Sequence, residues 1–539
     1  MSETGKKKIA IAGIASILLV ACVVGTALTV TKKNEDSSSS SAIGGQVSTS
    51  SKSIETMCQP TPYKETCEKS LESAKNTSDP KELVRAAFEN TVNEIASSIK
   101  NSAPFKDAEN DPRTKNALKI CDEVLDRSME EIKRSVTEME TNDLNTLIKT
   151  YIYDVRSWLS SAITFEETCI DAFANTTGDT GEKMKKVLKT ASELSIVALD
   201  IVSRFEEQLS GLQGLGLMTN RRLLTVEAGN RRLLEVAPLK PNVVVAQDGS
   251  GQHKTINDAL KTVPQNNAQP YVILIKAGIY NENVQIANTM TNVVFIGEGT
   301  NKTKITGNKN YLEGLPIYLT ATVAVSGQGF MAKDIAIENS AGPLKKEAIA
   351  LRVSAEMAVF HNCQIDGYQS TLMTHVGRQF YRDCTISGTI DFIFGDAVAV
   401  FQNCKLIVRK PEEMQTQSLS IAAQGRNQPF GTGAFLGRPW KLYSRTIVMQ
   451  SQIDGFIDPE GWTPWAGTFA LDTLYFVEYQ NRGQGANTDK RVSWKNYIKN
   501  PAQDVIAKFT PGVVLKGGDN TDGWVTKTGV PYESGMMKV

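Results

Sequence analysis

The sequence contains very little histidine: three residues in 539, namely His253, His361 and His375. Three histidines offer few candidates for a histidine-based catalytic triad or a histidine-rich metal site. We therefore expect carboxylates to carry out acid–base chemistry in this chain. An excess of charge of either sign is also lacking, because 59 Lys and Arg balance 59 Asp and Glu. The balance gives no overall basic signal for nucleic acid, and we expect no nucleic-acid partner.

Long uncharged apolar runs are rare, and the most extended one spans residues 9–31, directly after Lys6, Lys7 and Lys8. A run of this length is sufficient for a helix to cross a bilayer, whereas a signal peptide has a shorter apolar core and a small-residue cleavage site. We predict a signal anchor at 9–31 with a cytosolic tail at 1–8. A cleaved signal peptide and a buried helix of a soluble protein are the alternatives. The anchor and the signal peptide both deliver the remaining chain to the secretory pathway, the former as a membrane-anchored precursor.

The cysteines are compatible with export. Cys22 lies in the apolar run, and seven more follow it: Cys58, Cys67, Cys121, Cys169, Cys363, Cys384 and Cys404. An oxidising compartment allows them to pair, with one thiol left over. Three Asn-X-Ser/Thr sequons, at Asn76, Asn175 and Asn301, are glycosylation candidates in a lumenal chain.

A helical region follows a Ser-rich linker at residues 32–53. Across residues 54–210, apolar residues recur at steps of three and four, for example at Val84, Phe88, Val92, Ile95 and Ile99. Each such set forms one apolar stripe along a helix. Several helices of this length predict an antiparallel four-helix bundle.

A second linker, at residues 211–239, carries one tetrapeptide twice. The two copies are Arg221-Arg222-Leu223-Leu224 and Arg231-Arg232-Leu233-Leu234. Exposed dibasic sites in a flexible linker suit a processing protease, and two solvated charge pairs are the alternative. The intact repetition at a domain boundary favours processing.

The remaining residues, 240–539, have short β-branched runs and a repeat. Asn362-Cys363, Asp383-Cys384 and Asn403-Cys404 lie in matching segments, so that the cysteines are separated by 21 and 20 residues. A period near 20 with a short strand in each unit and no helical pattern indicates a solenoid. The leucine pattern of leucine-rich repeats is absent, so we predict a right-handed parallel β-helix. Loops between its turns would line a groove suited to an extended polymer.

Several stretches together resemble one family, the plant pectin methylesterases. They are Asp248-Gly-Ser-Gly251, Gly278-Ile-Tyr-Asn-Glu282, Gly367-Tyr-Gln369, Arg378-Gln-Phe-Tyr-Arg382, Asp391-Phe-Ile-Phe-Gly395, Leu436-Gly-Arg-Pro-Trp440 and Tyr479-Gln-Asn-Arg-Gly483. The resemblance covers about residues 240–535. The helical region, with its four cysteines, resembles the invertase/pectin methylesterase inhibitor bundle.

This resemblance implies a pectinesterase precursor with an inhibitor-like pro-region. The inhibitor family pairs its cysteines in chain order, which implies Cys58–Cys67 and Cys121–Cys169. The Arg-Arg-Leu-Leu copies resemble processing sites of such precursors, cut by a subtilisin-like protease. The implied partners are methyl-esterified homogalacturonan (pectin), the chain's own inhibitor-like domain and that protease. The implied destination of the mature domain is the extracellular cell wall, and no cofactor or metal is implied.

The resemblance also implies roles for five residues. Asp391 is the expected nucleophile, which attacks the methyl ester and splits the hydrolysis into acylation and deacylation. Arg438 would orient it and keep it ionised, because an adjacent guanidinium lowers a carboxylate pKa. Gln369 would donate to the oxyanion. Thr322, Arg438 and Trp440 would contact substrate, Trp440 by stacking on a sugar ring, although a core position for Trp440 is an alternative.

Two positions depart from the family pattern. Ser370 stands where the family has the Asp that acts as general acid and base, and Glu347 stands where it has a Gln that donates to the oxyanion. General acid–base catalysis contributes about 10²–10⁴ in rate, and one oxyanion donor contributes about 3–4 kcal/mol. A protonated Glu347 close to Asp391 would restore a donor and an acid.

A third departure is a gap before Arg438. The family normally has one more turn between Arg426 and Leu436, so about twenty to thirty residues are missing relative to it. Because the lost piece often carries the partner of Cys404, we expect Cys404 to be unpaired and Cys363–Cys384 to form a bridge. We also expect the gap to shift Arg438 and Trp440 relative to Asp391.

Two hypotheses follow from these observations. The first is a pectinesterase that demethylesterifies homogalacturonan. The second is an impaired or inactive homologue that binds pectin or acts through its inhibitor-like domain. Asp391, Arg438 and Trp440 favour the first hypothesis, and Ser370, Glu347 and the gap before Arg438 favour the second.

Overall fold

The computed structural model of the chain describes residues 49–59, 61–108, 111–142, 146, 150–174, 176–214, 240–410, 419–423, 434–517 and 521–537. The predicted anchor, both Arg-Arg-Leu-Leu copies and Asn175 lie outside these residues. Within them, no helix has the length and hydropathy needed to cross a membrane. Asn76 and Asn301 are exposed in turns, where a sequon is accessible to modification.

The N-terminal part is the predicted helical bundle. Four long helices, α4 (Pro80–Ala108), α5 (Pro112–Thr141), α7 (Ile152–Asp171) and α8 (Thr180–Gly214), pack around one apolar core. They are preceded by α2 (Thr49–Cys58), α3 (Lys64–Ser70) and the 3₁₀ turn η1 (Glu72–Ala74). Helix α5 begins in the expected way, with Pro at its first position and the Asp111 side chain accepting from the Thr114 amide at 2.9 Å.

Two disulfides fix this bundle, and both predicted pairs are confirmed. Cys58–Cys67 joins α2 to α3, and Cys121–Cys169 joins α5 to α7. Since each bond closes a loop of the unfolded chain, both stabilise the folded bundle.

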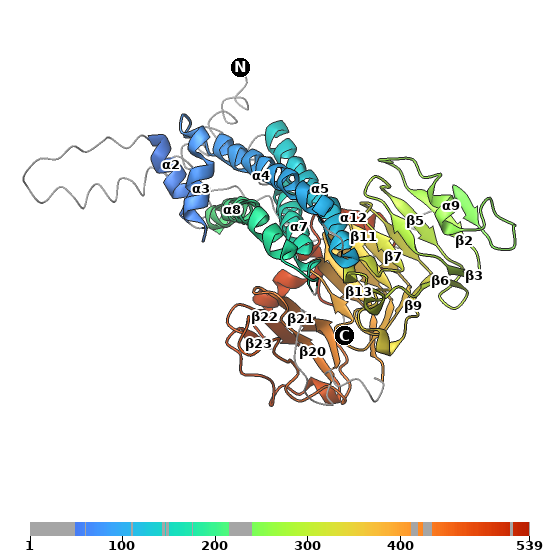
Figure 1. The fold of residues 1–539 in the computed structure, drawn as a ribbon. Helices are drawn as coiled ribbons and strands as arrows, with labels where there is room; N and C mark the ends of the chain where they lie inside the picture. The colour runs from blue at the N-terminus through green and yellow to red at the C-terminus, as the bar shows by residue number, and fades with distance from the viewer. Residues whose placement is uncertain are drawn as a thin grey trace, which may run out of the picture.

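The C-terminal part is a parallel β-helix, as predicted, and three sheets run along it (Figure 1). Sheet A contains β1 (Val243–Val245), β2 (Tyr271–Ile275), β5 (Val293–Ile296), β8 (Met331–Lys333), β11 (Ala358–His361), β14 (Arg378–Arg382) and β17 (Val398–Gln402). Sheet B contains β3 (Gly278–Asn281), β6 (Thr303–Gly307), β9 (Ala336–Asn339), β12 (Gln364–Asp366), β15 (Thr385–Gly388) and β18 (Lys405–Val408). Sheet C contains β4 (Val284–Ile286), β7 (Val323–Val325), β10 (Leu351–Ser354), β13 (Leu372–Val376), β16 (Ile393–Phe394), β19 (Leu419–Ala423) and β20 (Ala434–Arg438).

The sequence repeat corresponds to one turn of this helix. Asn362, Asp383 and Asn403 each link a sheet A strand to a sheet B strand with a positive φ, of 49°, 55° and 55°. Asn and Asp tolerate this left-handed backbone better than other non-glycine residues. Inside the helix, Phe360, Tyr381 and Phe401 stack turn upon turn, with ring centroids 4.9 and 4.6 Å apart.

The predicted Cys363–Cys384 bridge is wrong. Cys363, Cys384 and Cys404 are all free thiols, the first two buried and the third half-buried. They hold the same position in successive turns, since Gln364 pairs with Thr385 and Thr385 with Lys405 in parallel register. Stacked positions of parallel strands project their Cβ atoms in the same direction, whereas a disulfide needs Cβ vectors that converge.

The β-helix is interrupted where the family comparison shows a gap. Sheets A and B end at β17 and β18, and a separate sheet follows, made of β21 (Arg445–Met449), β22 (Tyr475–Tyr479) and β23 (Tyr497–Lys499). Sheet C alone continues, because β20 pairs directly with β19. The short helices α10 (Gln503–Ile506), α11 (Pro511–Val514) and α12 (Gly523–Thr526) complete the chain, and residues around α11 and α12 cover the outer face of sheet A.

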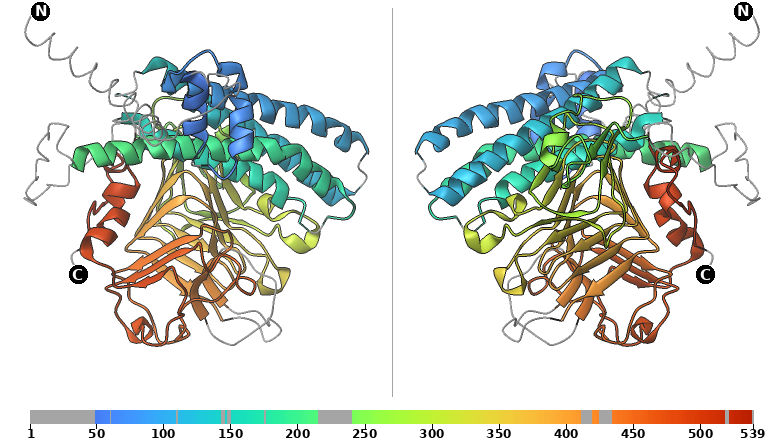
Figure 2. Two further views of the ribbon diagram at one scale, coloured as in Figure 1. Left: turned by 90° about the vertical axis from the view of Figure 1, so that its left-hand side faces the viewer. Right: turned by 90° about the vertical axis from the view of Figure 1, so that its right-hand side faces the viewer.

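The remaining short elements lie in the connections of the β-helix. They are helix α9 (Ile256–Leu260) and the 3₁₀ turns η3 (Tyr311–Glu313), η4 (Ile317–Leu319) and η5 (Pro343–Lys345). Two further 3₁₀ turns follow later in the chain, η6 (Gln484–Ala486) between β22 and β23 and η7 (Ala507–Phe509) between α10 and α11. Figure 2 shows the bundle lying across one face of the β-helix.

Candidate active site

Asp391 lies in a tight loop between β15 and β16, just before the start of β16 in sheet C. Its φ of +51° is left-handed. Two glycines make the loop feasible: a Cβ on Gly388 would lie 2.1 Å from Cβ of Phe392, and one on Gly395 would lie 1.9 Å from the carbonyl oxygen of Thr374. Backbone held in a sparsely populated region by its surroundings is typical of functional sites.

Arg438 pairs with Asp391 through two hydrogen bonds. Its Nε donates to Oδ1 at 2.9 Å, and its Nη2 donates to Oδ2. The expected shift of Arg438 caused by the gap is therefore wrong. The strand β20 carries Arg438 and pairs with β19, placing Arg438 beside Ala423, while β19 pairs with the strand that follows Asp391.

Two further residues support this pair and were missed by the sequence analysis. The Trp465 ring lies 5.4 Å from Cζ of Arg438, a cation–π contact that fixes the guanidinium plane. The hydroxyl of Ser420 donates to the Ala422 carbonyl at 3.1 Å, and its proximity to Asp391 lowers the pKa of that carboxyl. Neither residue lies in a motif quoted for the family, so no signal in the sequence singled them out.

The electrostatics of Asp391 differ from the expectation. Burial raises the pKa of Asp391 above its ordinary value, although Arg438 and the Ser420 hydroxyl lower it. The guanidinium thus offsets the desolvation of the carboxylate only in part.

The other predicted site residues lie on the same side of the β-helix. Gln369 is half-buried one turn before Asp391. Trp440 is half-buried, 6.2 Å from Phe394 between ring centroids, and packs against the bundle core. Thr322 is buried and its hydroxyl donates to the Glu338 carbonyl at 2.9 Å, so its substrate contact stays a prediction.

Both departures from the family pattern lie at the site. Ser370 is buried with a φ of +63°, and its amide donates to the Ile390 carbonyl at 3.0 Å. Burial raises the pKa of Glu347, and the charge of Asp391 raises it further while Lys346 lowers it. The charge of Asp391 therefore reaches Glu347 and favours the protonated form of its carboxyl.

The bundle covers the outer face of sheet C with apolar side chains. Tyr318, Ala324, Met373 and Phe394 from the β-helix are buried in the same cluster as the bundle core. This face is therefore continuous with the interior of the bundle, in agreement with the packed arrangement seen in both views of Figure 2.

Polar contacts hold the bundle in place at both ends of the covered face. Asp154 of α7 pairs with Arg378 at 2.5 Å, and both side chains are buried. At the other end Lys441, next to Trp440, pairs with Glu167 at 3.2 Å and with Asp171 at 3.0 Å.

The centre of the interface holds a buried histidine. Nε2 of His375 lies 2.7 Å from the Thr168 hydroxyl of α7, and its Nδ1 lies 2.8 Å from the Ser354 hydroxyl. Burial holds the pKa of His375 well below its ordinary value, and Arg352 and Arg127 add to the effect. His375 is thus a neutral hydrogen-bonding residue of the interface.

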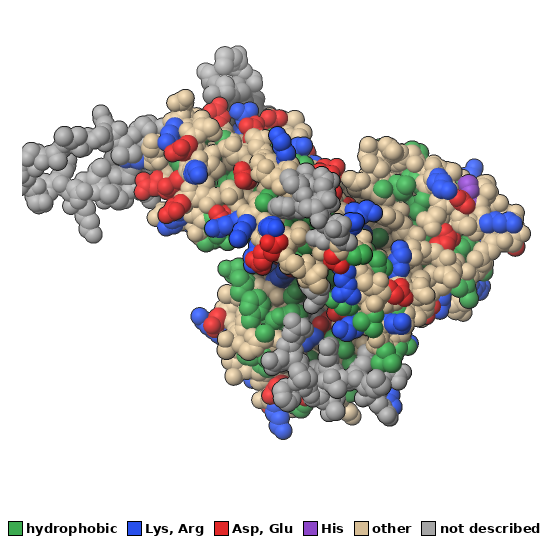
Figure 3. All heavy atoms as spheres, in the orientation of Figure 1, with side chains coloured by type: hydrophobic (Ala, Val, Ile, Leu, Met, Phe, Trp, Pro, Cys, Tyr) green, Lys and Arg blue, Asp and Glu red, His purple; other side chains and the backbone are tan. Residues whose placement is uncertain are grey.

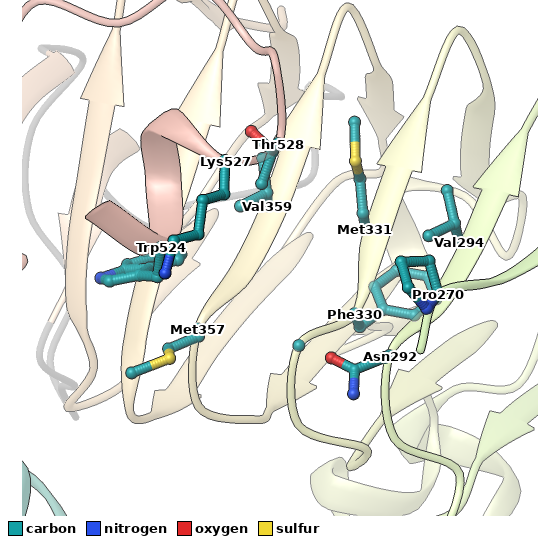
Figure 4. Close-up of a pocket in the computed structure, with 11 residues that line it drawn as sticks. Pro270, Asn292, Val294, Phe330, Met331, Met357, Val359, Trp524, Lys527 and Thr528 are labelled. Atoms are coloured by element: carbon teal, nitrogen blue, oxygen red, sulfur yellow. The ribbon is translucent and has the colours of Figure 1, made fainter. Parts of the chain in front are cut away.

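An apolar pocket of about 220 Å³ lies elsewhere, on the outer face of sheet A (Figure 4). Met331, Val359 and Trp524 are among its lining residues. Because Asp391 lies next to β16 of sheet C, this pocket is separate from the candidate site. On the face shown in Figure 3, basic and acidic side chains are interspersed, as the balanced composition leads one to expect.

The fold and the site together define an ester hydrolase: an aspartate–arginine pair at the edge of a parallel β-helix, covered by a helical bundle. Known proteins agree with this definition. Residues 242–434 and 430–518 match the Pectinesterase family, and residues 52–201 match the plant invertase/pectin methylesterase inhibitor family.

Individual relatives give the same result. A probable pectinesterase/pectinesterase inhibitor of Arabidopsis thaliana is 44% identical over 99% of this chain and 83% of its own length. A pectinesterase of Petunia integrifolia is 51% identical over 66% of this chain and its whole length. The solved pectin methylesterase from carrot is 43% identical, covers 55% of this chain and 99% of its own, and has a TM-score of 0.52. The chain belongs to the pectinesterase family of carboxylic ester hydrolases and carries an inhibitor-like domain before the esterase domain.

Proposed function

We propose that Asp391 hydrolyses the methyl esters of homogalacturonan and that the bundle of the same chain holds this site closed until the linker is cut. The Asp391–Arg438 pair beneath the bundle is the observation that carries the proposal. In this arrangement the nucleophile Asp391 and its orienting cation Arg438 lie under the helical bundle, which would exclude a polymer from the site.

The reaction proceeds in two steps, acylation of Asp391 and deacylation by water. The Asp391 carboxylate attacks the ester carbonyl carbon, the bond to the methoxy oxygen breaks, and methanol leaves after gaining a proton. Water then attacks the resulting anhydride, which releases the galacturonate carboxylate and frees Asp391. In this proposal Gln369 donates to the oxyanion, Arg438 orients the nucleophile, and Trp440 and Thr322 contact the polymer.

The cover acts in two ways in this proposal. It blocks access to the face that a pectin chain would occupy. It also desolvates Asp391, and the raised pKa of that carboxyl disfavours the ionised form that attacks. Release of the bundle hydrates Asp391 again, so access and ionisation are restored together.

The setting proposed for the precursor follows from the sequence outside the described residues. The segment 9–31 anchors it in a membrane of the secretory pathway, and a subtilisin-like protease cuts at Arg221–Leu224 or Arg231–Leu234. The esterase domain then acts in the extracellular cell wall, and glycans at Asn76, Asn175 and Asn301 belong to the lumenal chain.

Methanol release from methyl-esterified pectin tests the function. The full chain is expressed with a site-specific protease sequence in the linker 215–239, and it is cut and freed of its bundle before the assay, with Asp391→Asn as the matched variant. The proposal predicts release by the cut parent and at least a thousandfold less by the variant. A cut parent with no activity that still binds pectin would instead favour the non-enzymatic alternative.

A further inference from the structure

The site lacks an acid at the position expected for one. Ser370 is buried beside the loop of Asp391, and a hydroxyl with an ordinary pKa cannot give a proton to methoxide as a carboxylic acid does. Methanol cannot leave efficiently without that proton. Another group of the site must therefore supply it.

Glu347 lies one turn before Gln369 and two turns before Asp391 along the β-helix. The amide of Ala348 donates to the Gln369 carbonyl at 3.2 Å, and the amide of Ser370 donates to the Ile390 carbonyl at 3.0 Å. The three side chains thus occupy successive turns, with about 5 Å between turns. A substrate ester held above Gln369 would therefore lie between Glu347 and Asp391 along the β-helix.

The backbone of Glu347 is hydrogen-bonded, and its carboxyl group has an oxygen without a partner among the described residues. Its backbone carbonyl accepts from the Tyr311 amide at 2.9 Å. Its Oε2 is buried and has no hydrogen-bond partner among the described residues. Buried polar atoms in folded proteins almost always have a partner, and an exception at a reactive site calls for a functional explanation.

The surroundings favour the protonated form of this carboxyl. Burial is the main cause of its raised pKa, and the charge of Asp391 adds to it. Lys346 opposes the shift, but its ammonium lies 5.7 Å from the Tyr311 ring centroid, a cation–π contact on the neighbouring segment. Arg113 of the bundle lies over the same ring at 5.3 Å and leaves with the bundle.

We propose that Glu347 is the general acid and base of this active site and replaces the carboxylate absent at Ser370. The inference rests on the proposed function. In acylation, protonated Glu347 donates its proton to the departing methoxy oxygen as the Asp391–acyl bond forms, which yields methanol and a Glu347 carboxylate. In deacylation, that carboxylate takes a proton from the water that attacks the anhydride, which regenerates both groups.

The test uses the full chain after the linker is cut and the bundle is removed, together with four variants prepared in the same way. Glu347→Gln keeps the shape and a donor but removes the proton, and Glu347→Gln with Ser370→Asp restores the residues typical of the family. Asp391→Asn reports on the nucleophile, and Glu460→Gln, an exposed glutamate on a distant loop, is the matched control. Methanol release is measured from pH 4 to pH 9, about the range in which shifted carboxyls titrate.

The expected result is a fall of about 10²–10⁴-fold in kcat for Glu347→Gln, with recovery in the double variant. The parent also loses activity as pH rises through the pKa of Glu347, since the acid must carry a proton. Glu460→Gln leaves both quantities unchanged.

Other outcomes would overturn either the role of Glu347 or the proposed function itself. An active parent with an equally active Glu347→Gln overturns the role of Glu347 and leaves the proposed function standing. A silent parent with an active double variant also overturns it, because Glu347 then fails to replace the missing acid. If parent and double variant are both silent, or if Asp391→Asn is as active as the parent, the proposed function itself fails.

Discussion

At the scale of single residues, the Asp391–Arg438 pair determines the chemistry, and its geometry depends on neighbours that the motifs do not include. Arg438 holds both carboxylate oxygens and lies against the Trp465 ring. A planar guanidinium makes such a two-point contact, whereas an ammonium acts as a point charge.

Replacing Arg438 with Lys therefore lowers activity even though the positive charge is kept. We expect kcat for methanol release by the cut chain to fall at least tenfold, because one of the two hydrogen bonds that orient Asp391 is lost. The substitution Arg445→Lys, at an exposed arginine of β21, is the control. Equal activity in Arg438→Lys and parent would show that the two-point contact of the guanidinium with Asp391 is unimportant.

The sequence predicted this pair but could not predict its surroundings. Asp391, Gln369 and Arg438 lie in long ordered motifs, so they could be singled out. Trp465 and Ser420 belong to no such motif, and the raised pKa of Asp391 is caused by its burial in the folded chain. Burial of this kind depends on tertiary packing, which local patterns do not encode.

At the scale of elements, the predicted bundle and β-helix are confirmed, while the predicted bridge between turns is not. Periodicity identified the helices and the 20-residue repeat, because both patterns are local. The bridge failed because a repeat places cysteines at equivalent positions, and equivalent positions of stacked parallel strands do not converge. Similarly, Arg438 still reaches Asp391 despite the gap, because β20 pairs directly with β19 in sheet C.

A buried glutamate gives the bundle a pH-dependent stability. Burial raises the pKa of Glu166 to about 7, and its Oε1 accepts from Ser195 at 2.7 Å and from Ser128 at 2.9 Å. The folded bundle retains this proton to a higher pH than the unfolded chain does. Its unfolding free energy therefore falls as pH rises from about 4 to about 7, by about 3 kcal/mol in total.

The variant Glu166→Gln should lack this contribution. Urea unfolding followed by the helical circular dichroism signal, at pH 4.5 and pH 7.5, is expected to show a smaller loss of stability in the variant than in the parent (about 3 kcal/mol less). Glu182→Gln, at an exposed position of α8, should behave as the parent does. An identical pH dependence in Glu166→Gln and parent would mean that Glu166 is ionised in the folded bundle.

At the scale of the whole molecule, the docked bundle turns an open polymer-binding face into an interior. Its apolar cluster runs from α5 and α7 into Met373 and Phe394 of sheet C. The ion pairs at either end, Asp154–Arg378 and Lys441 with Glu167 and Asp171, fix its position.

Removing Asp154 should loosen the docked state selectively. Arg378 keeps Glu356 as a partner, so we expect a loss of about 2 kcal/mol, or about thirtyfold in the dissociation constant of the cut bundle. Titration calorimetry between the separated parts of Asp154→Ala and of parent measures it, with Glu68→Gln on an exposed helix position as control. Unchanged affinity in Asp154→Ala would show that the apolar cluster alone holds the bundle.

The most direct test of the central claim compares one preparation before and after a single cut. The full chain, with a protease sequence placed between residues 215 and 239, is assayed for methanol release from methyl-esterified pectin, then cut, freed of its bundle by chromatography and assayed again. A covered Asp391 predicts almost no release from the intact chain and at least a hundredfold more after the bundle is removed. Equal release before and after removal would contradict the account, because the site would then be open while the bundle is docked.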